Sequence, residues 1–473
     1  MGTNGLKSLC AVAAAALLGL GATPSREAQL LAAARKGDEA SVRALLTQKV
    51  MPSAAEPDGT TPLHWAVHHN QLDLVGLLIR AGARPDAENR YGVRPLELAA
   101  INGNASIIEV LLRAGASANV ASAEGETPLM IAARTGNVDG VALLLNHGAA
   151  VNTKETWRGQ SALMWAVGER HPAIVRLLLD AGADLHAKST RGYTPFLFAV
   201  RNGDTELVTR LLDAGANVNE KGGEGTTALG FAITNAHFEL ASFLLSKGAD
   251  ANADMPGGTA LHQVTRTRNY EFGAINRPAA VQTGNMDALD LVRVLIKGGA
   301  DPNARVVQRL ARQGSFDNNY LNLTGATSFF LAARAADPVL MRLLLEYGAD
   351  PNISSTEEVT PLMVAAGAGY VQGQSIGEPA NRLEAVRICL ELGANVHAVS
   401  KSLETAMHGA ATGGVNDVVQ LLFDRGARLD VKAKDGFTPL QIADGTKSNF
   451  RRWDHTADLL RQLEKKTAQQ QQQ

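Results

Sequence analysis

Three closely spaced histidines are the first residues of this chain that could do chemistry. Residues 61–88 read TPLHWAVHHNQLDLVGLLIRAGARPDAE and place His64, His68 and His69 within six positions, beside Trp65. Imidazoles bind metals and transfer protons near neutral pH. A metal site built on His68 and His69 would need a third ligand and supporting hydrogen bonds, which the sequence does not show. We therefore expect no metal here, and we ask whether the histidines serve the fold.

Two other patterns resemble catalytic motifs. Gly373-Gln374-Ser375-Ile376-Gly377 is formally G-x-S-x-G, but a nucleophile elbow needs a strand before the serine and a helix after it, and here both flanks are predicted helices. Cys389 lies in the apolar stripe AVRICLEL, which favours a buried thiol over a reactive one. We find no C-x-x-C-H, H-E-x-x-H, Walker or Rossmann motif. The sequence thus predicts no enzyme, no catalytic residue and no cofactor.

The word TPLHWA recurs along the chain with a period of about 33 residues, and a Gly-Ala pair keeps the same period. Such a period identifies a repeat architecture. The words after Thr61 begin at Arg94, Thr127, Ser161, Thr194, Thr227, Thr259, Thr327, Thr360, Thr405 and Thr438.

Each repeat predicts a pair of helices. Thr61 is a good N-cap and Pro62 fits the first helical position, so a short helix begins there. After a tight turn at Asn70, the apolar residues of LDLVGLLIR recur at helical spacing and predict a second helix. Gly82 ends that helix, since a glycine can adopt the left-handed conformation. The turn-rich remainder predicts a hairpin-like finger that leads to the next pair.

This pattern resembles the ankyrin repeat, whose 33-residue unit carries T-P-L-H-x-A. The resemblance implies an all-α fold, an α-solenoid of about twelve repeats with capping units and inserted loops. It implies that His64, like His262 and His408, hydrogen-bonds backbone between neighbouring repeats. It also implies that the short helices line a concave face and that the fingers project to one side.

The period divides the chain into segments. We expect an N-terminal capping repeat at 26–57, the repeat array at 58–435, a C-terminal capping repeat at 436–466 and a disordered Gln-rich tail at 467–473. Extra residues interrupt the period near 265–285, 306–325 and 370–382. These insertions are either tolerated loop growth, which costs little entropy, or added contact sites.

The first 22 residues have the layout of a secretory signal peptide. Lys7 precedes an apolar run from Leu9 to Leu20, and small residues follow. A run of about twelve residues is too short to span a bilayer, which needs roughly 20. We therefore expect cleavage near Ala22 and a periplasmic or secreted protein, with an N-terminal membrane tether or a buried helix as the alternatives. The whole chain is then similar to exported bacterial ankyrin proteins.

The composition narrows the class of partner. The net charge is −2, charged residues make up 19% of the chain, and no block of Lys or Arg supplies the positive surface that nucleic acid requires. We therefore expect a protein partner, no nucleic acid, no stable membrane insertion after signal cleavage, and a monomeric chain.

Contact residues are expected at finger tips and at the ends of the short helices. Trp, Tyr and Arg are enriched in interface hot spots, and we favour the stretch from Trp157 to Arg201. The candidates for partner binding are His68, His69, Arg90, Tyr91, Arg134, Trp157, Arg158, Glu169, Arg191, Tyr193, Arg201 and Arg334.

These observations predict a non-enzymatic scaffold that binds another protein through the concave face and fingers of the solenoid. One alternative is a regulatory or assembly subunit of an exported enzyme. The other is a hydrolase or metal-dependent activity built on the insertions.

Overall fold

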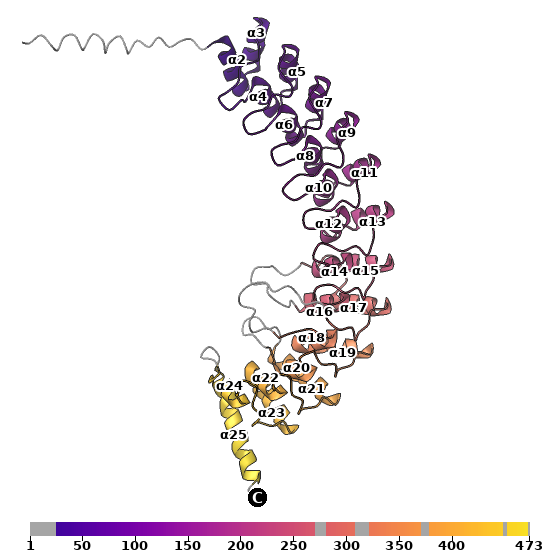
Figure 1. The fold of residues 1–473 in the computed structure, drawn as a ribbon, viewed down its shortest axis with the longest axis vertical. Helices are drawn as coiled ribbons and strands as arrows, with labels where there is room; N and C mark the ends of the chain where they lie inside the picture. Colours follow the sequence, from indigo (N-terminus) through magenta and orange to yellow (C-terminus); the bar gives the residue numbers. More distant parts are fainter. Residues whose placement is uncertain (1–24, 270–280, 308–320, 370–377, 448–451, 472–473) are drawn as a thin grey trace, which may run out of the picture. The chain divides into compact units, whose positions relative to one another are not determined.

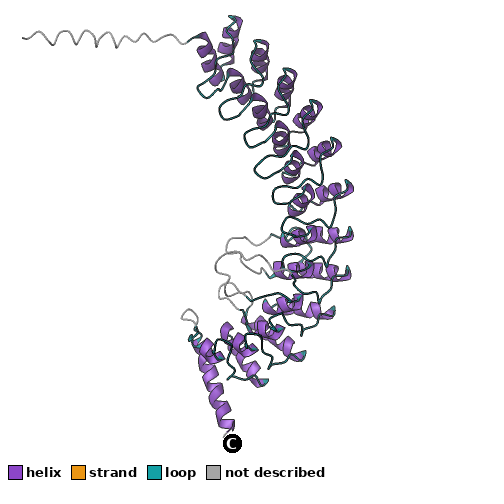
Figure 2. Ribbon diagram, viewed as in Figure 1, coloured by secondary structure: helices purple, strands orange, loops and turns teal. Residues whose placement is uncertain are grey.

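The computed structural model describes residues 25–269, 281–307, 321–369, 378–447 and 452–471. These residues form twelve pairs of α-helices, α2 to α25, and no β-strand (Figures 1 and 2). The predicted all-α solenoid of about twelve repeats is therefore confirmed. None of the helices formed by these residues is both long and apolar enough to cross a membrane.

The chain divides into two compact units, Met1–Thr190 and Arg191–Gln473. The helices of unit 1 are α2 (Arg26–Arg35), α3 (Glu39–Thr47), α4 (Pro62–His68), α5 (Leu72–Arg80), α6 (Pro95–Asn102), α7 (Ala105–Arg113), α8 (Pro128–Thr135), α9 (Val138–Asn146), α10 (Ala162–Gly168) and α11 (Pro172–Asp180).

Unit 2 contains the remaining helices. They are α12 (Pro195–Arg201), α13 (Thr205–Asp213), α14 (Ala228–Thr234), α15 (Phe238–Ser246), α16 (Ala260–Arg268), α17 (Ala288–Lys297), α18 (Ser328–Arg334), α19 (Pro338–Glu346), α20 (Pro361–Ala366), α21 (Pro379–Glu391), α22 (Ala406–Gly413), α23 (Asn416–Asp424), α24 (Pro439–Ala443) and α25 (Asp454–Gln471).

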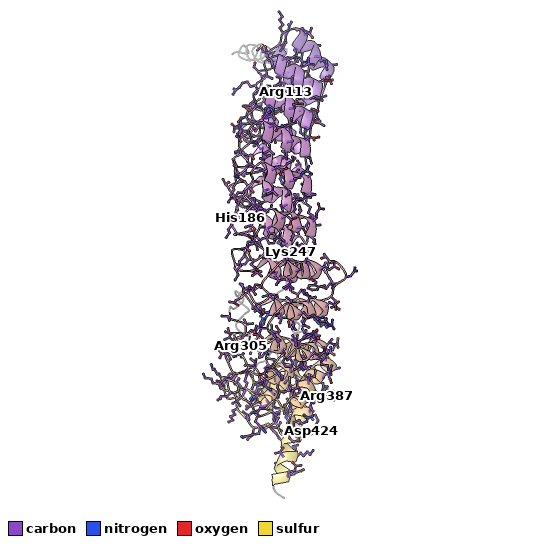
Figure 3. All side chains as sticks on the ribbon, turned by 90° about the vertical axis from the view of Figure 1, so that its right-hand side faces the viewer. Arg113, His186, Lys247, Arg305, Arg387 and Asp424 are labelled. Carbon is purple, nitrogen blue, oxygen red and sulfur yellow. The ribbon has the colours of Figure 1, made fainter. Side chains whose placement is uncertain are left out.

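Within each unit the helices form two layers. In unit 1 the even-numbered helices pack against one another in chain order and form the first-helix layer. The odd-numbered helices, from α3 to α11, form the second-helix layer. The loops that join successive pairs project from the side of the first-helix layer (Figure 1). Figure 3 shows the two sides of unit 1: Arg113 lies over the second helices, and His186 marks the loop side.

The helix boundaries follow from the capping residues in the sequence. Thr61 caps α4 by accepting the backbone N–H of His64, and Pro62 occupies the first helical position. Gly82 follows α5 with a φ of 93°, which a residue with a Cβ rarely adopts. Leu144, Leu178 and Leu344 are fully buried between the layers. The predicted helix pair and its end signals are therefore confirmed.

His64, His262 and His408 hold neighbouring repeats together. Each Nδ1 accepts the backbone N–H of the capping threonine at 3.1 Å. Each Nε2–H donates to a carbonyl of the next repeat, at 3.1 Å to Val93, 3.1 Å to Ala326 and 3.3 Å to Phe437. The structural role that the resemblance implied for these histidines is confirmed.

Two segment predictions need correction. The stretch 370–382 was expected to be an insertion between helices, but α21 begins at Pro379, where Pro stands at the first helical position after Glu378. The tail 467–473 was expected to be disordered, but α25 continues to Gln471. Gln is a good helix former, and the tail extends a helix that is already nucleated. Most of the three insertions lies outside the described residues.

The buried His262 predicts acid sensitivity. Its side chain is completely buried, and desolvation lowers its pKa to about 4, against about 6.5 in an unfolded chain. Between these two values the unfolded chain binds a proton that the folded chain does not. The free energy of unfolding should therefore fall by up to about 3 kcal/mol as the pH drops through this window.

His262→Gln is the matched variant, because Gln441 occupies the equivalent position and accepts the backbone N–H of Thr438. Urea unfolding of the full chain at pH 7 and pH 5 should show a smaller loss of stability in this variant than in the native chain. The same loss in both chains would contradict the assignment.

Candidate functional site

The fingers of unit 1 are four tight turns at residues 56–60, 89–93, 122–126 and 155–160. Each is closed by backbone hydrogen bonds across the turn, such as Asn89 N to Val93 O at 3.1 Å and Ser122 N to Glu126 O at 2.9 Å. Gly125, at the end of its turn, has a φ of 79°, and a Cβ there would crowd Thr156 of the next finger. The glycine therefore allows both the turn and the close approach of its neighbour.

Hydrogen bonds also join one finger to the next. Arg90 N donates to Asp58 O at 2.7 Å, and Thr156 N donates to Glu124 O at 2.8 Å. The Thr156 hydroxyl donates to the same Glu124 carbonyl at 2.8 Å. These bonds join the first finger to the second and the third finger to the fourth, and they fix the backbone positions of the tip side chains within each pair.

The tip of the fourth finger carries the most exposed aromatic residue among the described residues. Trp157 is 71% exposed, and the Arg158 guanidinium lies over its ring at 4.0 Å from the centroid. The buried carboxylate of Glu155 accepts the backbone N–H groups of Trp157, Arg158 and Gln160 at 2.6 to 3.0 Å. Glu155 thus fixes the loop that presents the Trp–Arg pair.

The second finger presents a similar pair. Tyr91 is 61% exposed, and the Arg90 guanidinium lies 4.9 Å from its ring centroid and donates to its hydroxyl at 2.6 Å. Stacked guanidinium groups and rigid rings lose little freedom on binding, which makes them effective anchors. The structure thus places four predicted contact residues on two finger tips of unit 1.

The ends of the first helices provide the other predicted contacts of unit 1. His68 and His69 are exposed and cluster with Trp65, with ring centroids 5.3 to 6.0 Å apart. His69 Nε2–H donates to Arg35 O at 3.0 Å, so this histidine also joins two repeats. Glu169 is exposed at the end of α10.

The Arg134 side chain already contacts two neighbouring side chains, Glu126 and Trp165. Its guanidinium donates to Glu126 Oε1 at 3.0 Å and lies 5.5 Å from the centroid of the Trp165 ring. The side chain is half-buried. We therefore treat Arg134 as a support for Trp165 more than as a free anchor.

The remaining candidates lie in unit 2. Arg191 and Arg201 are exposed, and Arg334 is half-buried. Tyr193 is half-buried against Phe198 and Phe231, with centroids 5.9 and 5.3 Å away. Its hydroxyl donates to Glu224 at 2.8 Å, and burial, reinforced by this hydrogen bond, raises its pKa to about 12. Tyr193 therefore contributes to packing. The favoured stretch from Trp157 to Arg201 crosses the boundary between the two units, which lies between Thr190 and Arg191.

The expected contact set omitted a row of side chains on the first helices. Trp65 and Trp165 in unit 1, and Phe198 and Phe231 in unit 2, occupy the same position of the repeat. The signal was present in the sequence, because the fifth letter of TPLHWA, SALMWA, TPFLFA and TALGFA is aromatic each time. Trp65 and Trp165 are half-buried, and their indole N–H groups have no hydrogen-bond partner.

Catalytic or metal chemistry finds no support among the described residues. They contain no group of three or more His, Cys, Asp or Glu side chains that could hold a metal ion. Cys389 is fully buried, and desolvation raises the pKa of its thiol to about 12, as expected for a structural cysteine. The Gly373–Gly377 motif lies outside the described residues.

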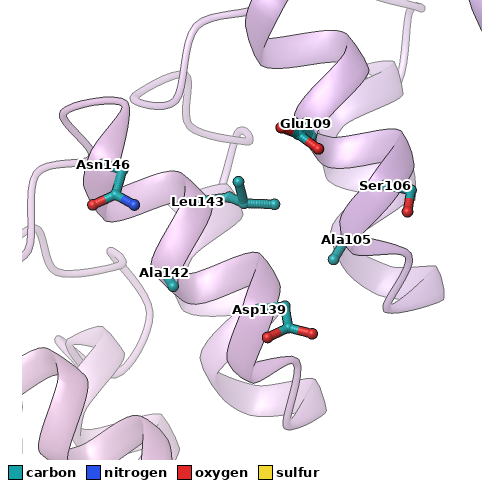
Figure 4. A pocket seen from close by; sticks show the side chains of 7 residues that line it. All are labelled: Ala105, Ser106, Glu109, Asp139, Ala142, Leu143 and Asn146. Atoms are coloured by element: carbon teal, nitrogen blue, oxygen red, sulfur yellow. The ribbon is translucent and has the colours of Figure 1, made fainter.

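A shallow depression of about 350 Å³ lies between α7 and α9 in the second-helix layer (Figure 4). Glu109 and Asp139 contribute carboxylates to it, while Ser106, Leu143 and Asn146 complete much of its lining. Glu109 is paired with Arg113 at 2.6 Å. The depression combines no nucleophile with a base and is separate from the fingers.

Taken together, the geometry defines a helical repeat protein that presents binding side chains on a regular scaffold. The family model for ankyrin repeats, which describes three copies, matches residues 13–89, 30–122, 96–189 and 196–273. These matches cover more than half of the chain. The chain belongs to the ankyrin-repeat family.

Several curated proteins are similar over part of the chain. Human ankyrin repeat and SOCS box protein 16 is 36% identical over 212 residues, which cover 35% of this chain and 47% of the human protein. Mouse B-cell lymphoma 3 protein homolog is 32% identical over 176 residues, covering 33% and 37% respectively. Regulatory protein NPR6 of Arabidopsis thaliana is 33% identical over 112 residues, covering 22% and 23%. The chain spans less than half the length of each of these relatives.

Glu155 should hold the backbone of the fourth finger in its folded conformation. In Glu155→Ala, three backbone N–H groups lose a charged acceptor, which costs about 1–3 kcal/mol locally. We expect hydrogen–deuterium exchange at residues 156–160 to accelerate at least tenfold, while the helices keep their protection. Glu124→Ala, at the exposed tip of the preceding finger, is the control and should leave that exchange unchanged. Equal exchange in native and Glu155→Ala chains would refute this role.

Proposed function

We propose that this protein is a non-enzymatic scaffold that binds a partner protein through the fingers and the first-helix layer. The observation that carries the proposal is the fourth finger, in which a buried carboxylate fixes an exposed Trp157 stacked with Arg158. Membership of the ankyrin-repeat family supports it, because such repeats generally mediate protein–protein interactions. A preformed surface lowers the ordering cost of association, and a few aromatic and Arg anchors supply much of the affinity.

Gly168 lies on this surface, beside Trp165, at a position where the fold does not require a glycine. It ends α10, has no left-handed φ, and a Cβ built on it would meet no atom within 4 Å. Neither backbone conformation nor packing inside the described fold requires a glycine there, although glycine costs up to about 1 kcal/mol in a helix. Because Gly168 lies three residues after Trp165, a side chain at 168 would share its helix face. The glycine keeps the surface beside Trp165 open for a partner.

We also propose that the protein acts outside the cytoplasm, as a periplasmic or secreted bacterial protein and as a monomer. The support is the N-terminal sequence, in which Lys7 precedes the apolar run Leu9–Leu20 and small residues follow. N-terminal sequencing of the protein isolated from its host tests this proposal. A first residue near Thr23 supports export, and an intact Met1 in a soluble cytoplasmic fraction counts against it.

A regulatory or assembly subunit of an exported enzyme is the second candidate. It uses the same surface, and the similar Arabidopsis protein NPR6 is named a regulatory protein. An enzyme whose activity changes when the purified chain is added would favour this form of the proposal. A hydrolase or metal-dependent activity on the insertions has no supporting contact among the described residues.

Filling the space beside Trp165 should block the partner. We expect Gly168→Phe to reduce capture of partner proteins from host extract at least tenfold, because the new ring covers the open surface. Gly168→Ala should capture as the native chain does, since its methyl group occupies little space. Thermal unfolding of both variants should match the native chain to within a few degrees. Undiminished capture by a folded Gly168→Phe chain would refute a role for this surface.

A further inference from the structure

The tips of the four fingers of unit 1 alternate in charge. Asp58, Arg90, Glu124 and Arg158 lie at successive tips, giving the order negative, positive, negative, positive. Arg90, Glu124 and Arg158 are exposed, and Asp58 is half-buried. The Thr60 backbone N–H, with help from Arg90, lowers the pKa of Asp58, so that its carboxylate is ionised at neutral pH.

The two positive tips differ from other arginines on the same side of the unit. Arg35 is paired with Glu56 at 3.7 Å, Arg94 with Glu88 at 2.5 Å and Arg134 with Glu126 at 3.0 Å. By contrast, Arg90 and Arg158 form no ion pair with any carboxylate of the described chain, and each stacks on an exposed ring instead. Their guanidinium groups therefore keep donors available for a carboxylate of a partner.

The spacing of the tips follows from the stacking of the repeats. Neighbouring layers of packed helices lie roughly 8–10 Å apart. The packing of α4, α6, α8 and α10 in chain order sets the order of the tips, and backbone bonds join the first finger to the second and the third to the fourth. An extended chain advances about 3.3 Å per residue, so that every third residue meets the next finger. A run of like charge, such as a nucleic acid or a polyacidic tail, would meet a repulsive tip at every second finger.

We propose that the four fingers of unit 1 select an extended partner segment whose charged residues alternate in sign at every third position. Lys or Arg of the segment faces Asp58 and Glu124, and Asp or Glu faces Arg90 and Arg158. The exposed rings of Tyr91 and Trp157 contact the residues between those charges. This inference rests on the proposed function and defines the chemistry of the partner.

Three synthetic peptides test the proposal against the full chain at low ionic strength. The first carries Lys, Glu, Lys and Glu at every third position, separated by uncharged residues. The second has the same composition with the order Lys, Lys, Glu, Glu. The third carries the alternating charges seven residues apart, which suits a helix. We expect the first peptide to bind about tenfold more tightly than the other two, because two attractive contacts become repulsive in the second.

The double variant Arg90→Glu with Glu124→Arg provides the decisive comparison. It changes the order of the tips to negative, negative, positive, positive, and both side chains are exposed, so the fold should be retained. We expect the preference to invert, with the Lys, Lys, Glu, Glu peptide bound about tenfold more tightly than the alternating one. A thermal unfolding curve that matches the native chain verifies folding.

Equal binding of the first two peptides, absence of binding, an unchanged preference in the folded double variant, or tighter binding of the third peptide would overturn the inference. These outcomes are separate from a failure of the proposed function. If Gly168→Phe abolishes capture of host proteins while the peptides show no preference, the scaffold function stands and the charge rule fails.

Discussion

The structure depends on one constraint: a single helix pair cannot bury its own apolar side. Leu74 and Leu78 of α5, Ile107 and Leu111 of α7, and the equivalent residues of later repeats are fully buried only because neighbouring pairs cover them. The chain therefore forms a stack in which each repeat depends mainly on its neighbours. The buried histidines add polar contacts between repeats, which fix the distance and the register of the layers.

This stacking determines where function can lie. Most apolar residues are used between the layers, while the finger tips carry the most exposed aromatic side chains of unit 1, Tyr91 and Trp157. The same hydrogen bonds that join one finger to the next also fix where Tyr91 and Trp157 are displayed. A surface of this kind suits recognition of an extended partner better than catalysis, which needs a closed site with converging groups.

The sequence predicted the parts that follow from local rules. The period, the Thr-Pro starts and the Gly-Ala stops gave the helix pairs, and the family resemblance gave the role of His64. Trp65 and Trp165 were not among the expected contact residues. When the repeats are compared for the residues they share, a half-buried aromatic residue cannot be distinguished from a core residue. Helix α25 was underestimated because a Gln-rich composition indicates disorder, although Gln also extends an existing helix.

The contacts of individual side chains could not be derived from the period. The carboxylate of Glu155 accepts backbone N–H groups from later residues of its own finger, which is one residue longer than the other three fingers of unit 1. Tyr193 packs against two phenylalanines, and the neighbouring finger places Glu224 within hydrogen-bonding distance of its hydroxyl. Both arrangements result from tertiary contacts between repeats, and the sequence of a single repeat does not contain them.

Site-specific photocrosslinking in the host tests the account most directly. A photoreactive amino acid replaces Tyr91 or Trp157 on the fingers, and as controls Leu72 or Val138, which are exposed at 39% each on second helices. The account predicts adducts with the same partner protein from both finger positions and none from the two second-helix positions. Adducts formed only from Leu72 or Val138 would contradict it.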